Sequence, residues 1–359
     1  MKRIVLAITA VAALAACTKS EVAYEAPAEI GFATVAANMT KAAVDGTVFP
    51  TDLNMYVYAN TTTNNTADAD YFAKAEFTYL SAYNAINTES SDTKPVWGGG
   101  SSSGNRHPYY WPNVNKLHFA GFSKSGNVAS ATVAYDCSAN TLSIAGYTPT
   151  GDDNDLMWFP STEFTQTEGY GKNTTYVPVK MYHACAWITF LVKGDTVTGA
   201  ENTTYTLTSL NIANIDNTAN VVCTGSATVS SASTVWSENE AQTEDYSVTI
   251  GYDGKLTQSE TNVETGDATT TSGNVVVIPQ KPGVLELTYT YTSGASKTIT
   301  EVFSIENNNA PSLKLNDGNT QNWEPGKHYI YTITIKANEI LIAPTPVDWT
   351  DGNFNVTVE

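Results

Sequence analysis

Alternation of apolar and polar residues, repeated along almost the whole chain, limits this sequence to a fold built of β-strands. Short runs of β-branched and aromatic residues place apolar side chains at every second position, which gathers them on one face of an extended strand. Apolar residues at the spacing of an amphipathic helix are hard to find. We therefore expect an all-β chain, with strands over residues 53–58, 75–80, 117–122, 141–147, 187–193, 205–212, 246–252, 274–278, 284–291, 297–305 and 328–336.

Turn-forming residues separate these strands. Clusters of Gly, Asn, Asp, Ser and Thr between many short strands are typical of β-sandwiches. Residues 60–70 and the Gly- and Ser-rich stretch 97–104 are expected to be loops. A polar, Gly-containing segment follows residue 193, and it predicts a boundary between an N-terminal β-sandwich, 29–195, and a C-terminal β-sandwich, 196–359.

The N-terminus indicates export. Two basic residues precede the apolar run 4–16, which is shorter than the about 20 residues of a membrane-spanning helix and predicts a secretory signal peptide, 1–16. Small residues before Cys17 resemble the bacterial lipobox, so Cys17 is expected to carry fatty acyl chains such as palmitate, with 17–28 as a polar, lipidated tether. An ordinary signal peptide with an incidental cysteine is the alternative.

The charge balance excludes some partners. The chain has 36 Asp and Glu against 18 Lys and Arg, a net charge of −18. Contacts to the phosphates of a nucleic acid need a basic surface, so nucleic acid is not expected as a partner. A polybasic membrane patch is disfavoured for the same reason.

No signature of catalysis or metal binding emerges. The four histidines, two of which are His118 and His183, lack metal-ligand spacing, and these two lie in strand patterns that favour hydrogen-bonded structural roles. Residues 152–155 could offer oxygens to Ca²⁺, but they lack EF-hand spacing and a solvated turn is favoured. We therefore expect no cofactor, no metal and no enzymatic activity.

Three cysteines remain in the exported body, Cys137, Cys185 and Cys223. A sparse, odd set is not a disulfide framework, even in an oxidising compartment. One pair could form. Buried free thiols in apolar strands are the favoured interpretation for Cys185 and Cys223.

Six segments are similar, in the same order, to segments of one known family, and they span nearly the whole chain. They are the lipobox at Cys17, Thr40-Lys41-Ala42 with 46–58, Tyr109-Tyr110-Trp111-Pro112 with 117–122, His183-Ala184-Cys185-Ala186 with 187–190, Pro325-Gly326-Lys327-His328 with 329–331, and Val347-Asp348-Trp349-Thr350-Asp351-Gly352. Together they resemble the fimbrillin family, the type V pilins of Bacteroidales-type bacteria.

The resemblance implies a fold and a function. The fold would be two tandem transthyretin-like Greek-key β-sandwich domains. Such proteins reach the outer membrane as lipoproteins, and a protease then removes an N-terminal segment that includes one strand. A strand of the neighbouring pilin subunit fills the vacated groove, and a head-to-tail polymer grows into a cell-surface fimbria that supports adhesion to a host or bacterial surface.

At the N-terminal end, the resemblance points to a strand and to a cleavage position. Residues 29–35 are strand-like, with Ile30 and Phe32 on one face, and they precede the position that the family would cut, Lys41-Ala42. The family's protease favours Arg, so a Lys-specific or broader protease would be required here. The alternative is that Lys41 is an ordinary exposed loop residue.

At the C-terminal end, residues 340–358 are candidates for the donated strand. Their apolar positions are Ile340, Leu341, Ile342, Phe354, Val356 and Val358, interrupted by two prolines and a turn. The alternative is that this region is only the last strand of the C-terminal sandwich, as in a tip subunit that accepts a strand and donates none.

Two other function classes remain open. A monomeric outer-membrane surface lipoprotein could bind glycans or host ligands through the aromatic residues at 109–111. A secreted β-sandwich hydrolase is the third class, although no pair of carboxylates stands out in the sequence.

Overall fold

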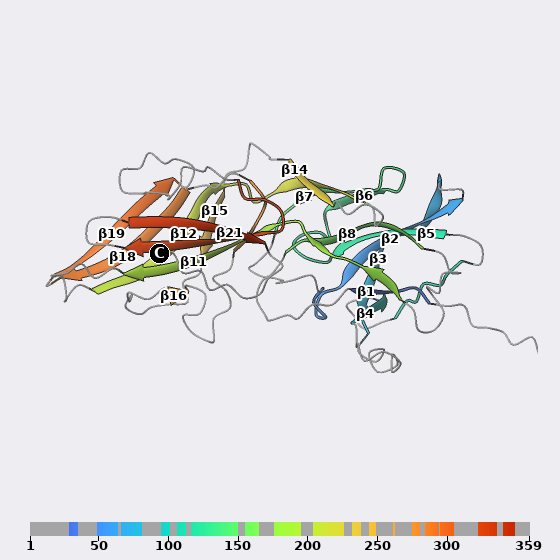
Figure 1. Ribbon diagram of the computed structural model, residues 1–359, viewed down its shortest axis with the longest axis horizontal. Coiled ribbons are helices and arrows are strands. Elements are labelled where there is room, and N and C mark those ends of the chain that lie inside the picture. Colours follow the sequence, from blue (N-terminus) through green and yellow to red (C-terminus); the bar gives the residue numbers. More distant parts are fainter. Residues whose placement is uncertain are drawn as a thin grey trace, which may run out of the picture.

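The computed structural model describes residues 29–34, 49–63, 66–80, 95–100, 106–112, 116–149, 155–164, 176–194, 204–225, 232–237, 244–248, 261–262, 275–280, 284–293, 295–304, 322–335 and 340–348. Every regular element in these ranges is a β-strand, so the all-β prediction is confirmed. Within them, no helix has the length and apolarity needed to cross a membrane. Figure 1 shows an elongated arrangement of sheets, with β1 to β8 at one end.

The largest sheet has eight strands. Their order is β10-β8-β5-β2-β3-β4-β1-β9. The bounds are β1 Gly31–Thr34, β2 Met55–Thr63, β3 Thr66–Tyr79, β4 Val96–Gly99, β5 Lys116–Ser123, β8 Met157–Phe164, β9 Val177–Val179 and β10 Tyr182–His183.

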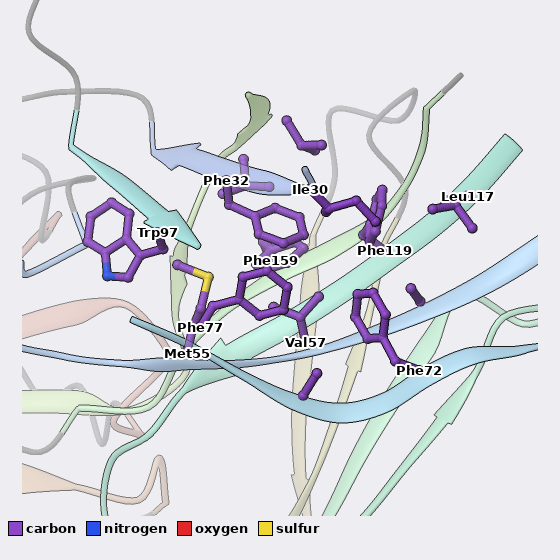
Figure 2. Packing of buried hydrophobic residues seen from close by; sticks show 14 of the residues in the cluster. Ile30, Phe32, Met55, Val57, Phe72, Phe77, Trp97, Leu117, Phe119 and Phe159 are labelled. Carbon is purple, nitrogen blue, oxygen red and sulfur yellow. The ribbon is translucent and has the colours of Figure 1, made fainter. Parts of the chain in front are cut away.

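This sheet curls back on itself. Three strands separate β1 from β5 in the sheet, yet Phe32 of β1 packs edge-on against Phe119 of β5, with ring centroids 5.2 Å apart. A bulge in the 14-residue strand β3 contributes to the bend: Lys74 has a positive φ of 48°, and the pairing with β2 shifts register nearby. The curl encloses an aromatic core between β1 and the strands opposite it (Figure 2).

A four-stranded antiparallel sheet covers the other face of these strands. Its order is β14 (Ser233–Ser237), β13 (Ala219–Thr224), β7 (Thr141–Tyr147) and β6 (Thr132–Asp136). In β13, Ala219, Val221 and Cys223 are buried while the residues between them are exposed. This alternation presses one face of the sheet onto a second core, which includes Phe122 and Trp158 of the large sheet.

Two further sheets lie at the other end of the molecule (Figure 1). One has the order β16-β11-β20-β21, with β17 also paired to β11, and the other has the order β15-β12-β18-β19. Their bounds are β11 Ala186–Gly194, β12 Thr204–Ile215, β15 Glu244–Val248, β16 Thr261–Asn262, β17 Val275–Val277, β18 Val284–Ser293, β19 Ala295–Ser304, β20 Lys327–Ile335 and β21 Ile340–Asp348.

Strand pairing crosses the boundary predicted near residue 195. Strand β11 precedes it, yet β11 pairs in parallel with β20 over eight positions. Strands β13 and β14 follow it, yet β13 pairs with β7. The division into 29–195 and 196–359, and the transthyretin-like topology of each part, therefore stay predictions.

Two predicted loops were wrong in part. Residues 60–70 were expected to be a loop, but β2 continues to Thr63 and β3 begins at Thr66. The stretch 97–104 was also expected to be a loop, but Val96–Gly99 forms β4 between β3 and β1. The glycines of β4 carry no side chain that other segments must avoid, and the buried Trp97 anchors the strand.

The expected buried thiols are confirmed. Cys137, Cys185 and Cys223 are buried, and none of the three forms a disulfide within the described part of the chain. Burial raises the pKa of the Cys185 thiol well above its ordinary value, and nearby Asp155 raises it further. Burial also raises the pKa of Cys223. Both thiols therefore stay protonated and unreactive in the folded chain.

Candidate strand-exchange site

Strand β1 is the part of the predicted site that the structure describes. The alternation of Ile30, Gly31 and Phe32 places two large apolar side chains on one face, and both are fully buried. The Phe32 ring lies 5.0 Å from Phe77 and 5.8 Å from Phe159, measured between ring centroids. Figure 2 shows these rings converging between β1 and the strands opposite.

Both edges of β1 are paired. Gly31, Phe32 and Ala33 pair antiparallel with residues 98, 97 and 96 of β4, and β1 runs parallel to β9 from Phe32 to Thr34. Strand β1 is therefore the second strand from the end of the sheet, with the three-residue strand β9 outside it. Among the described strands, β9 alone lies between β1 and the edge of the sheet.

The start of β1 is held by the segment at residues 106–112. The Ile30 N–H donates to the carbonyl oxygen of Tyr109 at 2.7 Å, and Glu29 forms a β-bridge with Tyr110. The Arg106 guanidinium forms an ion pair with the Glu29 carboxylate. Because this pair is partly exposed to solvent, its contribution to stability is small.

Strand β4 forms the wall beside β1. Trp97 is fully buried, and its indole N–H donates to the carbonyl oxygen of Leu53 at 3.0 Å. Its ring packs edge-on against Phe49, with centroids 5.2 Å apart. The wall is thus anchored independently of β1. The sequence analysis did not identify three residues of this site: Trp97, Arg106 and Tyr176, which precedes β9. For Trp97 alone the sequence offered a signal, a tryptophan next to glycines.

The C-terminal candidates lie in a different sheet. Ile340, Leu341 and Ile342 belong to β21, which pairs antiparallel with β20 from Ile335 to Lys327 and forms the edge of its sheet. The structure therefore does not bring them to β1. Phe354, Val356 and Val358 lie outside the described residues, as do Cys17, Lys41 and Ala42.

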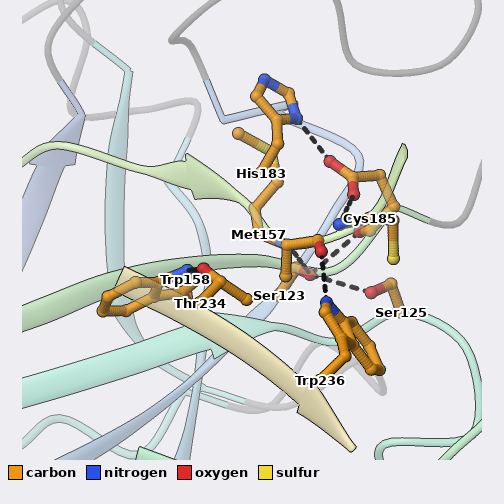
Figure 3. Close-up of polar contacts among 10 residues, drawn as sticks. Ser123, Ser125, Met157, Trp158, His183, Cys185, Thr234 and Trp236 are labelled. Carbon is orange, nitrogen blue, oxygen red and sulfur yellow. Dashed lines mark hydrogen bonds and ion pairs between the residues drawn. The ribbon is translucent and has the colours of Figure 1, made fainter. Parts of the chain in front are cut away.

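A second polar cluster lies where the chain crosses between sheets (Figure 3). Asp155 is fully buried, and its Oδ2 atom is 2.5 Å from Nδ1 of His183. The Cys185 N–H donates to the other carboxylate oxygen at 3.3 Å. The structural role expected for His183 is thus confirmed, whereas the solvated turn expected to include Asp155 is corrected at that residue, because His183 and Cys185 compensate its burial.

Among the described residues, no group of three or more His, Cys, Asp or Glu side chains is arranged to hold a metal ion. The turn residues 151–154 lie outside them.

Comparison with protein families decides the affiliation of the chain. The family described as fimbrillin-like matches residues 40–349, which is most of the sequence. This chain belongs to the fimbrillin-like family. The family resemblance expected from the six segments is thereby confirmed. The matched region begins at residue 40, six residues after the end of β1 at Thr34.

The chain is also similar to solved structures of fimbrial proteins. A fimbrial protein from Bacteroides vulgatus is 16% identical, and the match covers 90% of the fimbrillin-like chain and 100% of the other chain with a TM-score of 0.50. A fimbrial assembly protein from Parabacteroides distasonis is 10% identical, with 88% and 94% covered and a TM-score of 0.36. The first match supports the fold alone. No curated protein matches the fimbrillin-like chain in sequence.

Proposed function

We propose that this chain is a structural subunit of a cell-surface fimbria and that β1 temporarily fills a slot which a strand of a neighbouring subunit later occupies. Membership of the fimbrillin-like family supports the fimbrial role. The observation that carries strand exchange is the geometry of β1, a four-residue strand that fills a hydrophobic core and pairs on both edges.

Removal of β1 would leave a site that requires refilling. Loss of a buried Phe side chain alone typically costs about 3–5 kcal/mol of stability. The backbone groups of β4 and β9 that pair with β1 would lose their partners, and the rings of Phe77, Phe119 and Phe159 would face an empty space. An extended segment from another molecule would restore both the backbone hydrogen bonds and the apolar contacts.

The need for backbone N–H groups on both edges limits which part of residues 340–358 can be the donated strand. A strand in this slot needs N–H groups toward both neighbours, since β1 pairs with β4 and β9. Pro344 and Pro346 of β21 lack that hydrogen and remove two donors from one edge of the strand. An edge position tolerates this loss, whereas a position between two strands does not.

We therefore assign the donated strand to Phe354, Val356 and Val358 of the neighbouring subunit. These residues alternate with Asn355 and Thr357, the pattern of a strand with one apolar face. Ile340, Leu341 and Ile342 then stay in β21 as the base from which the tail extends. A contact of this kind is head-to-tail, so it builds an open filament.

Maturation and anchoring complete the proposal. Lipidation at Cys17 would hold the exported chain at the outer membrane, because acyl chains contribute about 0.8 kcal/mol per buried CH₂ group. Cleavage between Lys41 and Ala42 by a Lys-specific or broader protease would release the segment that contains β1. The fimbria would then present its subunits to a host or bacterial surface.

The test of this function is processing and polymerisation of the exported full-length chain. Lys41→Ala should abolish both cleavage and the ladder of polymers on a denaturing gel run without heating, while Lys116→Ala, at an exposed position on β5, should leave them intact. Deletion of residues 349–359 should permit cleavage but stop growth. A polymer ladder from the Lys41→Ala variant would show that Lys41-Ala42 is not the cleavage position.

One observation favours adhesion by the monomer as a second candidate. Tyr71 and Tyr110 are 38% and 41% exposed, and the Tyr71 hydroxyl donates to the carbonyl oxygen of Tyr110 at 2.5 Å. Exposed aromatic rings offer stacking faces to sugars. Glycan binding by the uncut chain that is lost in a Tyr71→Ala, Tyr110→Ala double variant would favour this function.

A further inference from the structure

The outer face of β1 carries a pair of directly opposed glycines. Gly31 of β1 pairs with Gly98 of β4, on the face opposite the one that buries Ile30 and Phe32. Although this face points away from the core, Gly31 is buried. Tyr176 closes over Gly31, and Leu80 closes over Gly98 together with the Glu29 carboxylate.

With the Tyr176 ring in its present position, the space over Gly31 is too small for a Cβ atom. A Cβ atom at this position would lie 2.5 Å from Cδ1 and 2.8 Å from Cε1 of Tyr176, and both separations are below the 3.0 Å that real Cβ atoms respect. The atoms concerned belong to the body of a rigid ring, so the ring must rotate away as a whole to make room. At Gly98 the nearest atom is a terminal methyl of Leu80, at 2.4 Å, and the other close atoms, Leu80 Cγ and Glu29 Oε1, also belong to flexible side chains.

The position of Tyr176 is tied to the same slot. Tyr176 immediately precedes β9, the strand that pairs with the second edge of β1. One segment therefore supplies both a hydrogen-bonding edge and a cover for the strand in the slot. A strand seated there meets β4 on one edge, β9 on the other, the aromatic core below and the Tyr176 ring above.

We propose that Tyr176 is a size filter on this slot, which admits a strand with glycine at the position of Gly31 and excludes a larger residue there unless the ring swings out. This inference rests on the proposed strand exchange. It also explains why β1 fits without rearrangement, since its sequence is large-glycine-large at residues 30–32. Leu80, with its flexible end, has the smaller effect.

The filter has a consequence for the donated strand. In the tail, the residues between the apolar positions are Asn355 and Thr357, and neither is glycine. When the tail is seated with its apolar side chains in the core, one of these two residues lies beneath Tyr176. Donor entry therefore requires rotation of the Tyr176 side chain. Because β1 needs no such rotation, β1 fits the slot better than the tail does, and the tail enters more slowly.

The steric claim is tested in the intact chain, independently of polymerisation. Hydrogen exchange of the β1 amides should quicken at least about tenfold in Gly31→Val, because overpacking of a closed site is destabilising. The penalty should fall below about threefold when Tyr176→Ala is added, whereas Tyr176→Phe, which keeps the ring, should not relieve it. Ala33→Val, on the same face of β1, is the matched control and should not respond to Tyr176→Ala. An equal penalty with and without the ring would overturn the filter.

The donor claim is tested by displacement. In a full-length chain cut at a protease site introduced between residues 35 and 48, β1 remains seated but unlinked. Tail peptides 352–359 carrying Asn355→Gly or Thr357→Gly are compared with the natural tail peptide. At least one glycine peptide should displace β1 about tenfold faster than the natural peptide, and Tyr176→Ala should equalise them. If the tail peptides displace β1 without a preference for glycine, the size filter is overturned but strand exchange is not. If no peptide displaces β1, including one of residues 29–35, strand exchange is overturned, and the hydrogen-exchange measurement alone then tests the filter.

Discussion

Asp155 and His183 form a buried hydrogen-bonded pair that ties the start of β8 to the crossover between two sheets. Oδ2 of Asp155 lies 2.5 Å from Nδ1 of His183, the last residue of β10. The next residues enter β11, which belongs to the sheet at the other end of the molecule. The Gly326 N–H, from the turn before β20, donates to the Cys185 carbonyl oxygen at 2.8 Å, so the crossover is held from both sides.

Replacement of Asp155 should therefore be strongly destabilising. Asp155→Ala removes the acceptor of two buried donors, and because each buried donor left without an acceptor costs about 1–3 kcal/mol, the free energy of unfolding should fall by about 2–5 kcal/mol. Urea unfolding of the exported chain measures this. Asp52→Ala, at an exposed turn, is the matched control and should change stability by less than about 0.5 kcal/mol. Equal, small effects of the two variants would show that the crossover is not held by this pair.

Phe32 should account for most of the contribution of β1 to stability. Phe32→Ala is expected to cost about 3–5 kcal/mol in the intact chain, because the ring is fully buried against three other phenylalanines. Val235→Ala, at a position 59% exposed, should cost less than about 1 kcal/mol. Denaturant titration compares the two. A cost for Phe32→Ala as small as that for Val235→Ala would mean that β1 contributes little to the core.

His328 should make stability depend on pH. Burial lowers the pKa of His328 to about 4, and the neutral ring stacks on Trp187 at 3.6 Å between centroids and pairs through Nε2 with the Thr189 hydroxyl at 2.7 Å. The unfolded chain, with a His pKa of about 6.5, binds a proton that the folded chain does not. Stability is thus present above about pH 6.5 and is lost as the pH falls toward 4, by up to about 3 kcal/mol.

The His328 effect is isolated by comparing two chains. Melting temperatures of the natural chain and His328→Gln, measured between pH 4 and 7.5, should show a shallower decline for the variant. Parallel curves would contradict the assignment, since other acid-sensitive groups are common to both chains.

The cysteines offer a probe of folding. Cys185 and Cys223 are fully buried, and burial raises the pKa of each thiol. Because the thiolate is the reactive form, a maleimide should modify neither residue in the folded chain and both after unfolding in urea. Peptide mass mapping identifies the modified positions. Rapid labelling of Cys185 under native conditions would show that the core around the crossover opens easily.

Local patterns predicted strands well where one face is buried and the other exposed. The strand expected at 141–147 has the bounds of β7, and residues 29–35 contain β1. Period-two alternation involves only neighbouring residues, so it can be recognised in a single sequence. The placement of Ile30 and Phe32 on one face followed from the same pattern, and the structure shows both side chains buried.

Features that depend on distant partners were not predictable in this way. The sequence of β4 predicts a glycine-rich loop. It forms a strand because neighbouring segments pack closely over Gly98 and Gly99, and these neighbours lie outside the strand itself. The burial of Asp155 depends on His183, 28 residues away. The pairing of β13 with β7 likewise depends on residues far apart in sequence. The filter over Gly31 required the position of Tyr176, which no local pattern indicates.

The central claim is that β1 is a replaceable occupant of the slot between β4 and β9. The most direct measurement is the structure of the assembled fibre at side-chain resolution. The account predicts that residues 29–34 are gone and that Phe354, Val356 and Val358 of the neighbouring subunit lie against Phe77, Phe119 and Phe159. A fibre in which each subunit still holds its own Ile30 and Phe32 in that core would contradict it.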